Sequence, residues 1–242
     1  PQGGMDGRPA GQSWQTCCNW NDQQWSTKNA AGQMDDREGF NWRYYILPYI
    51  EQDNLFRTVS RTVLYATPVK TYYCPSRRAP ILVNGTADAS AGRGQPDGVV
   101  INTAAGRMDF GQITDGTSNT VLVAEKWLHP SRYTNGADGG DNEVWCNAGW
   151  DQCVVRIGGG TYNHPQLGTI DRRPRPDIQA PNSVSSSGSP VTIWNESFGG
   201  PHSSGVQAVM CDGSVRNVSF SVSALAWAAA CSRNGGEVIG LD

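Results

Sequence analysis

The 242-residue sequence has no long apolar run. A membrane-spanning helix needs about 20 mostly apolar residues, and the apolar stretches here are far shorter, so neither a transmembrane helix nor a signal peptide is predicted. Hydrophobic residues make up 38% of the chain, while glycine (29 residues) and proline (14 residues) are plentiful. The length allows one large domain or two small ones, and we expect one domain over residues 1–242. The composition favours short strands and many loops rather than a helical bundle.

No charge of one sign dominates, and histidine is scarce. The chain has 19 basic and 22 acidic residues, a net charge of -3, which gives no indication of nucleic-acid binding or of binding to an anionic membrane surface. The three histidines, His129, His164 and His202, lie far apart, so their spacing predicts no zinc site. We interpret His202, in a Gly-rich turn, as a structural residue that bonds the backbone; a catalytic base is the alternative.

The seven cysteines lack the CxxC and CxxCH patterns. The absence of these two patterns argues against a zinc ribbon, a thioredoxin-like site and covalent haem, and favours an extracellular disulfide set. Cys146 and Cys153 are close enough in sequence for a loop or hairpin to join them, and Cys211 and Cys231 bracket the C-terminal elements. The connectivity stays open, and buried reduced thiols are the alternative.

Common catalytic patterns are missing too. The segment TDGTSNT, residues 114–120, places Ser118 near Asp115, but it matches neither the G-x-S-x-G elbow nor the D-x-[DN]-x-[DN]-G calcium loop. Asp, Ser, Thr and Asn before an apolar run are typical of a capped turn. No nucleophile, base and orienting residue can be placed together, so the chain is not expected to be an enzyme.

An acidic, Gly-rich loop at residues 134–143, TNGADGGDNE, is the candidate metal site. It holds Asp138, Asp141, Asn142 and Glu143. Ca²⁺ takes carboxylate and carbonyl oxygens on flexible loops, and the glycines let carbonyls turn inward. The prediction is therefore either no cofactor, with a solvated loop, or a structural Ca²⁺.

The polar region of residues 1–41 carries Trp14, Trp20 and Trp25. Indole faces can stack on sugar rings, so these residues are candidate ligand-binding side chains. The alternative is that they anchor a long loop on the core.

Further along, the periodicity predicts a helix broken at Pro48 over residues 41–56, a strand at residues 69–74, a loop that begins at Arg77 and Arg78, and a short strand at residues 99–102. Residues 171–190, DRRPRPDIQAPNSVSSSGSP, are rich in proline and serine and read as an inserted arm. The arm is either a mobile loop or a strap across a neighbouring subunit.

The C-terminal stretch, residues 197–237, predicts a β-hairpin followed by a helix. Two Val-rich runs, residues 206–211 and 214–220, flank Asp212 and Gly213. This pair favours a two-residue turn with Cys211 opposite Ser214. Ser221 or Ser223 then caps a short Ala-rich helix. The expected buried face of this helix holds Val222, Leu225, Ala226 and Ala229, and Gly235-Gly236 ends it.

Five segments together resemble a large planctomycete family of unknown function that is described as pilin-like or pseudopilin-like. They are WRYYILPYIEQDNLF, PVKTYYCPS, ITDGTSNTVLVAE, FGGPHSSGVQAVMCDGSVR and RNGGE. In that family a prepilin-type signal and a long apolar helix precede a globular head that ends in an H-x-G-G … DGSVR segment. Here His202-Ser203-Ser204-Gly205 departs from the family's HPGG.

The resemblance implies an α+β pilin-like head with an antiparallel sheet, and an N-terminal apolar helix that precedes this chain and provides its only link to a membrane. It also implies a structural subunit of an extracellular or cell-surface filament, whose partners are copies of itself, and it lends support to the calcium loop. The alternative function is an extracytoplasmic binding module for carbohydrate or another small solute.

Overall fold

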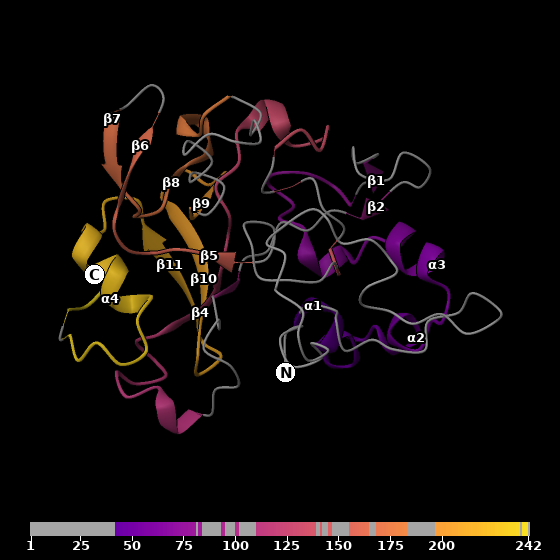
Figure 1. The fold of residues 1–242 in the computed structure, drawn as a ribbon, viewed down its shortest axis with the longest axis horizontal. Helices are drawn as coiled ribbons and strands as arrows, with labels where there is room; N and C mark the ends of the chain where they lie inside the picture. The colour runs from indigo at the N-terminus through magenta and orange to yellow at the C-terminus, as the bar shows by residue number, and fades with distance from the viewer. Residues whose placement is uncertain are drawn as a thin grey trace, which may run out of the picture.

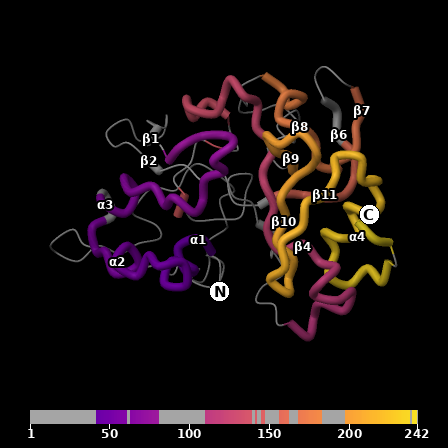
Figure 2. Tube along the Cα trace, turned by 180° about the vertical axis from the view of Figure 1, so that it is seen from behind, coloured from indigo at the N-terminus to yellow at the C-terminus, as the bar shows by residue number. Residues whose placement is uncertain are grey.

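The computed structural model describes residues 42–80, 82–83, 93–94, 100–101, 110–138, 141, 145–146, 155–164, 168–182, 197–237 and 239–241. Predictions for Trp14, Trp20, Trp25, Asn142, Glu143 and Cys153 fall outside these residues and stay predictions. The described part combines short helices with mostly antiparallel strands, which confirms the expected α+β class (Figure 1). Opposite views agree that α1 to α3 lie on one side of the molecule and α4 with its sheet on the other (Figures 1 and 2).

The beginning of the described chain is a series of short helical segments: α1 (Trp42–Tyr45), η1 (Leu47–Ile50), α2 (Asp53–Phe56), α3 (Arg61–Ala66) and η2 (Lys70–Tyr72). Pro48 lies in the first turn of η1, where its missing N–H costs no hydrogen bond, and Glu51 ends η1 in the left-handed region with φ 60°. The predicted broken helix is therefore confirmed. No helix in the described ranges combines the length and the apolar character that crossing a bilayer requires.

These segments enclose a largely aromatic core. Tyr44, Leu47, Tyr72 and Trp145 are buried in it, and the Tyr72 hydroxyl donates to the carbonyl of Arg43 at 2.5 Å. The strand predicted at residues 69–74 is wrong, because its buried residues do not alternate. Its backbone turns instead, with the Tyr72 N–H donating to the Val69 carbonyl at 2.9 Å.

An antiparallel sheet in the order β11-β10-β4 forms the other half. It consists of β4 (Val121–Ala124), β10 (Gly205–Met210) and β11 (Val215–Ser219), with a bulge between Val209 and Met210 where β10 pairs with β4. Val206, Ala208 and Met210 point to the buried face, and Gln207 and Val209 to the other, as the two-residue period of a strand requires.

The remaining strands are short. They pair as β1 (Leu82–Val83) with β2 (Arg93–Gly94), β3 (Val100–Ile101) with β5 (Val155–Arg156), β6 (Thr161–His164) with β7 (Gly168–Asp171), and β8 (Arg175–Pro176) with β9 (Gly199–Gly200). The β3–β5 and β8–β9 pairs are parallel. Three further 3-10 turns are η3 (Phe110–Gln112), η4 (Pro130–Arg132) and η5 (Asp177–Gln179). Strand β3 confirms the one predicted at residues 99–102.

The C-terminal hairpin forms, but in a register one residue away from the predicted one. Val209 pairs with Val215 and Ala208 with Arg216, because the loop has three residues rather than two. The Gly213 N–H donates to the Met210 carbonyl at 2.9 Å, and Gly213 adopts φ 85°. A type I turn followed by a left-handed glycine is the usual three-residue hairpin loop, so the Asp-Gly pair fixes a turn here but not the two-residue form.

Helix α4 (Ala224–Ala230) follows, and the side chain of Ser223 caps it by accepting a hydrogen bond from the Ala226 N–H. Its buried face is Ala226, Trp227 and Ala230, which pack on the inward side chains of β10 and β11. The prediction that Leu225 is buried is wrong, since this side chain is 72% exposed. Trp227, rather than Leu225, is the large side chain of α4 that packs against the sheet.

Buried ion pairs tie the two halves together. Arg77 pairs with Asp177 at 2.8 Å and donates to the carbonyl of Lys126 at 2.8 Å. The Arg78 guanidinium binds both carboxylate oxygens of Asp141, at 2.7 and 2.9 Å, and Lys126 binds Asp141 as well. Arg77 and Arg78, expected to open a loop, are thus buried cross-links.

The same contacts change the interpretation of residues 171–190. Residues 171–182 are packed rather than arm-like: Asp177 is buried, and the carbonyl of Pro176 accepts a hydrogen bond from the Trp127 indole at 2.9 Å. Residues 183–190 lie outside the described ranges. The expected strap across a neighbouring subunit stays a prediction for that part alone.

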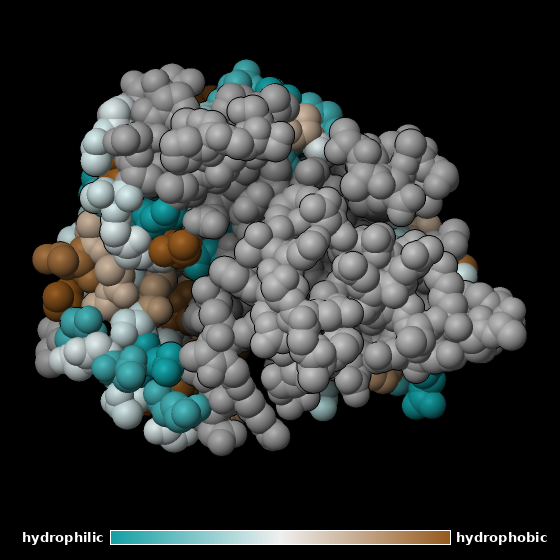
Figure 3. Space-filling view, viewed as in Figure 1, coloured by the Kyte–Doolittle hydropathy of each residue, from teal (hydrophilic) through white to brown (hydrophobic). Residues whose placement is uncertain are grey.

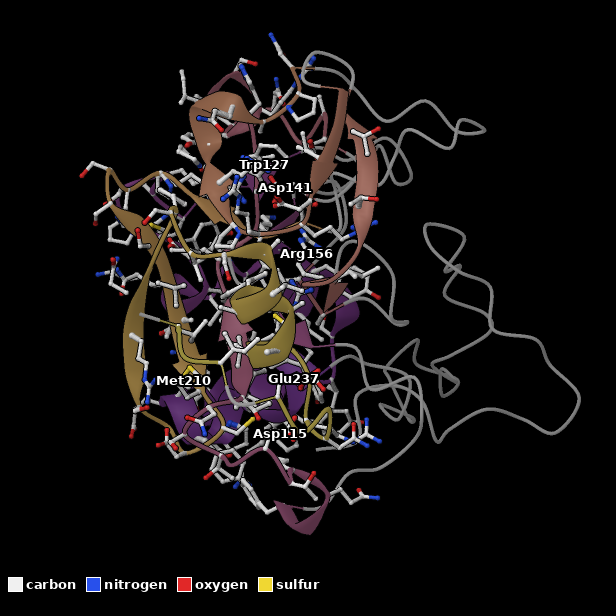
Figure 4. All side chains as sticks on the ribbon, turned by 90° about the vertical axis from the view of Figure 1, so that its left-hand side faces the viewer. Asp115, Trp127, Asp141, Arg156, Met210 and Glu237 are labelled. Atoms are coloured by element: carbon white, nitrogen blue, oxygen red, sulfur yellow. The ribbon has the colours of Figure 1, made fainter. Side chains whose placement is uncertain are left out.

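Asp115 holds the C-terminal loop against the turn at residues 114–120. Its two carboxylate oxygens accept hydrogen bonds from the N–H groups of Gly235 and Gly236, at 2.8 and 2.9 Å. Figure 4 shows Asp115 and Glu237 close together at the foot of α4. The segments ITDGTSN and RNGGE, far apart in sequence, therefore form one substructure.

Replacing Asp115 with alanine should free this loop. Hydrogen bonds to a charged group contribute roughly 1.5–3 kcal/mol each, so we expect faster amide exchange at Gly235 and Gly236 and a lower free energy of unfolding. Exchange measured by nuclear magnetic resonance checks the first effect. Exchange rates at the two glycines equal to those of the unmodified chain would contradict the assignment.

Candidate functional site

Cys74, Glu125 and His202 converge at one place between the two halves of the fold. Their ligand-type atoms all lie within 4.8 Å of one another. The His202 Nε2 lies 3.1 Å from Oε1 of Glu125 and 3.6 Å from Sγ of Cys74. Within the described residues this is the group of His, Cys, Asp and Glu side chains with the geometry of a metal site.

Glu125 directly follows β4, and its carboxylate is held in place from two directions. Its Oε2 accepts a hydrogen bond from the Gln207 N–H at 2.9 Å, and its Oε1 faces His202. The backbone of Glu125 is fixed as well, since its carbonyl accepts from the Gly199 N–H at 3.1 Å. Gly200 leaves room for the carboxylate, because a Cβ at this glycine would lie 2.9 Å from Oε2.

Cys74 follows η2 at the start of a tight turn. Its carbonyl accepts hydrogen bonds from the N–H groups of Arg77 and Arg78, at 3.0 and 3.1 Å. Burial, with the hydrogen bond and negative charge of Glu125, raises the pKa of the Cys74 thiol to about 11, although the Ser76 N–H and Arg77 lower it. The thiol therefore carries its proton at neutral pH when no cation is present.

The ion pairs described above set the distance between these segments. Arg77 and Arg78 lie three and four residues after Cys74, and Lys126 directly follows Glu125. Because Arg77 donates to the carbonyl of Lys126 at 2.8 Å, the turn at Cys74 is bonded to the end of β4. The cluster is thus attached to a buried, cross-linked framework of ion pairs.

The cluster is accessible from solvent. The side chain of His202 is 26% exposed and that of Glu125 is 12% exposed. His202 sits in a bend just after β9 and contacts a carboxylate and a thiol through its side chain. A role limited to bonding the backbone, as expected from the sequence, does not account for these contacts.

The geometry differs from that of a nucleophile, base and orienting acid. In such a triad the histidine uses one ring nitrogen for the nucleophile and the other for the acid. Here the same Nε2 faces both Cys74 and Glu125. Three electron-pair donors with ligand atoms within 4.8 Å of one another are an arrangement suited to a shared cation.

The calcium loop predicted from sequence is described at two of its four residues. The carboxylate of Asp141 is fully buried and already bound by Arg78 and Lys126, whose charges it compensates. Asp138 is buried beside it, and its carbonyl accepts the Asp141 N–H at 2.9 Å. The calcium prediction stays a prediction for this loop, but Asp141 serves there as an internal counter-ion.

The expected disulfides are absent from the described residues. Cys146, Cys211 and Cys231, three of the four cysteines expected in disulfides, are free thiols in the structure, and Cys153 lies outside the described residues. Cys146 instead packs within the aromatic core. Cys231 lies against Gly158, where an added Cβ would meet its sulfur at 2.3 Å.

Sequence reasoning did not single out Cys74 or Glu125, and it placed His202 apart from any site. A signal was present: PVKTYYCPS, ITDGTSNTVLVAE and FGGPHSSG, three of the segments that carry the resemblance, each contain one of these side chains. The spacing between them, 128 residues from Cys74 to His202, could not indicate that they meet.

Comparison with known proteins places the chain in a family of unknown function. No curated protein and no solved structure matches the chain. Residues 9–224 match the family described as "Protein of unknown function (DUF1559)". Since this match covers most of the 242 residues, the chain belongs to the DUF1559 family.

Proposed function

We propose that the chain is a non-catalytic, structural subunit of an extracellular or cell-surface pilin-like assembly, in which the heads contact copies of themselves. The observation that carries the proposal is an apolar row across the outward face of the main sheet. Val123, Val209 and Val215 lie directly opposite one another on β4, β10 and β11. The extracellular location rests on the resemblance described above.

The row leads to an open edge of the sheet. Val215 is 66% exposed and Leu122, on β4, is 44% exposed. In the described residues β11 pairs with β10 on one side only. An outer strand that presents apolar side chains is a template for pairing with another chain unless charges or a covering segment protect it.

Helix α4, which covers the buried face of the sheet, carries a separate apolar surface on its solvent side. Leu225 is 72% exposed there, and Figure 3 shows apolar side chains at the surface over α4 and the neighbouring C-terminal segment. Specific interfaces bury more than roughly 1,000 Å² in total. We therefore expect the outward sheet face and the β11 edge to supply the core of a contact that loops extend.

Sedimentation of the 242-residue chain at increasing concentration tests this proposal. We expect reversible self-association, and Val215→Lys should weaken it at least about tenfold, because a charge on an outer strand opposes edge pairing. Val63→Lys is the matched control, since Val63 is 52% exposed on α3, away from the sheet. It should associate like the unmodified chain.

Two outcomes would overturn the proposal. One is a chain that remains monomeric at high concentration, which would favour a binding module for carbohydrate or another small solute. The other is self-association that Val215→Lys leaves unchanged, since the contact would then lie elsewhere.

A further inference from the structure

We propose that Cys74, Glu125 and His202 form a binding site for a single Zn²⁺ ion. The inference goes beyond the proposed assembly function and does not depend on it. Its basis is the convergence of a thiol, an imidazole nitrogen and a carboxylate, from three segments far apart in sequence, with all ligand atoms within 4.8 Å of one another.

Two of the three distances between ligand atoms can be compared with those around one tetrahedral ion. A sulfur at about 2.3 Å and a nitrogen at about 2.0–2.1 Å from Zn²⁺ lie about 3.5–3.6 Å apart at the tetrahedral angle. The Cys74 Sγ and the His202 Nε2 are 3.6 Å apart. The 3.1 Å between His202 Nε2 and Glu125 Oε1 is slightly shorter than the about 3.4 Å expected for a nitrogen and an oxygen on the same ion.

The donor set selects the metal class. Thiolate and imidazole favour borderline or soft ions such as zinc, whereas Ca²⁺ and Mg²⁺ prefer oxygen ligands alone. Three protein ligands also leave one tetrahedral position for water or another ligand. The partial exposure of His202 and Glu125 gives an ion a route to the site.

The surroundings already orient the ligands. Glu125 keeps Oε1 toward the site because Oε2 is occupied by the Gln207 N–H at 2.9 Å. Hydrogen bonds of this kind, made by the groups behind the ligands, typically change metal affinity 10–100-fold when they are lost. A Cβ at Gly200 would press on the same carboxylate, so Gly200→Ala should weaken zinc binding by about that factor.

Calorimetric titration of chelator-treated protein with Zn²⁺ alone tests the site. We expect one equivalent to bind, and Cys74→Ser, Glu125→Gln and His202→Gln each to weaken binding by at least about 100-fold, more than loss of a group behind the ligands. Cys211→Ser and His129→Gln are the matched controls, because Cys211 and His129 lie outside the cluster. Both controls should bind like the unmodified chain.

A second measurement does not rely on the variants folding. With Co²⁺ in place of Zn²⁺, the unmodified protein should show the visible absorption of a tetrahedral site together with a thiolate-to-metal charge-transfer band. Failure to bind one equivalent, a cobalt spectrum without the thiolate band, or affinity that survives in folded Cys74→Ser and His202→Gln would each overturn the proposal.

Discussion

Replacing Asp141 with asparagine should lower the free energy of unfolding by about 3–5 kcal/mol, the usual cost of removing one partner from a buried ion pair. Its carboxylate has no solvent exposure and is bound by Arg78, whose side chain is 1% exposed, and by Lys126, whose side chain is 2% exposed. An amide in its place removes the negative charge that Arg78 and Lys126 share at this position, so the positive charge in the interior is less well compensated. That poorly compensated charge, rather than the loss of favourable contacts, accounts for most of the expected effect.

Urea unfolding at neutral pH, followed by tryptophan fluorescence, gives the measurement. Asp53→Asn is the matched control, because its ion pair with Arg57 is exposed, with side chains 49% and 76% accessible. Exposed pairs contribute roughly 0–1 kcal/mol. Equal, small losses in the two variants would contradict the role assigned to Asp141.

The pH dependence of the free energy of unfolding should include a contribution from the protonation of Asp141. Burial alone raises the pKa of Asp141, but Arg78 and Lys126 outweigh it and hold that pKa below its ordinary value. A depressed folded pKa gives stability that is present above the unfolded pKa of about 3.9 and is lost as the pH falls through the folded pKa. The stability gap between the unmodified chain and Asp141→Asn should therefore narrow with acidification below about pH 4.

Trp227→Ala should lower the free energy of unfolding by a similar amount, about 3–5 kcal/mol, because it leaves a cavity in the core between α4 and the sheet. Trp227 is fully buried, and its ring meets Phe198 edge-on, with centroids 5.0 Å apart at 80°. The cavity would open between α4 and the sheet, because the core there combines Trp227 with the inward residues of β10 and β11.

Leu225→Ala provides the control on the same helix. Leu225 is two residues before Trp227 but 72% exposed, so its truncation should change the free energy of unfolding by less than about 0.5 kcal/mol. Urea titrations of both variants check the difference. Similar losses would mean that α4 packs through the face predicted from sequence and not the observed one.

The elements that could be predicted from sequence are those determined by interactions between residues close together in the chain. Ser223, one of the two predicted caps, caps α4, because a cap depends on residues three positions away. The hairpin register was missed because Asp-Gly suits both a two-residue turn and the three-residue loop in which Gly213 is left-handed. Leu225 and Trp227 both fit an amphipathic spacing, and the packing partners alone decide which of them is buried.

The candidate site could not be predicted, because its parts are brought together by long-range ion pairs. Nothing near Arg78 indicates Asp141 as its partner, and a pair of arginines after a proline ordinarily suggests an exposed loop. The acidic residues of the Gly-rich loop suggested a cation site, but in the structure the cations around Asp141 are side chains. Local composition identified the charged group without identifying what it binds.

The contacts that close this fold join residues 63, 100, 121 and 128 positions apart, at Arg78 with Asp141, Arg77 with Asp177, Asp115 with Gly236, and Cys74 with His202. The entropy of closing a loop grows only with the logarithm of its length, so doubling one of these intervals costs about 0.6 kcal/mol. The segments between the anchoring residues can therefore gain or lose many residues at little cost in stability. A fold held at a few distant points leaves the length of its surface loops free to diverge while its framework stays in place.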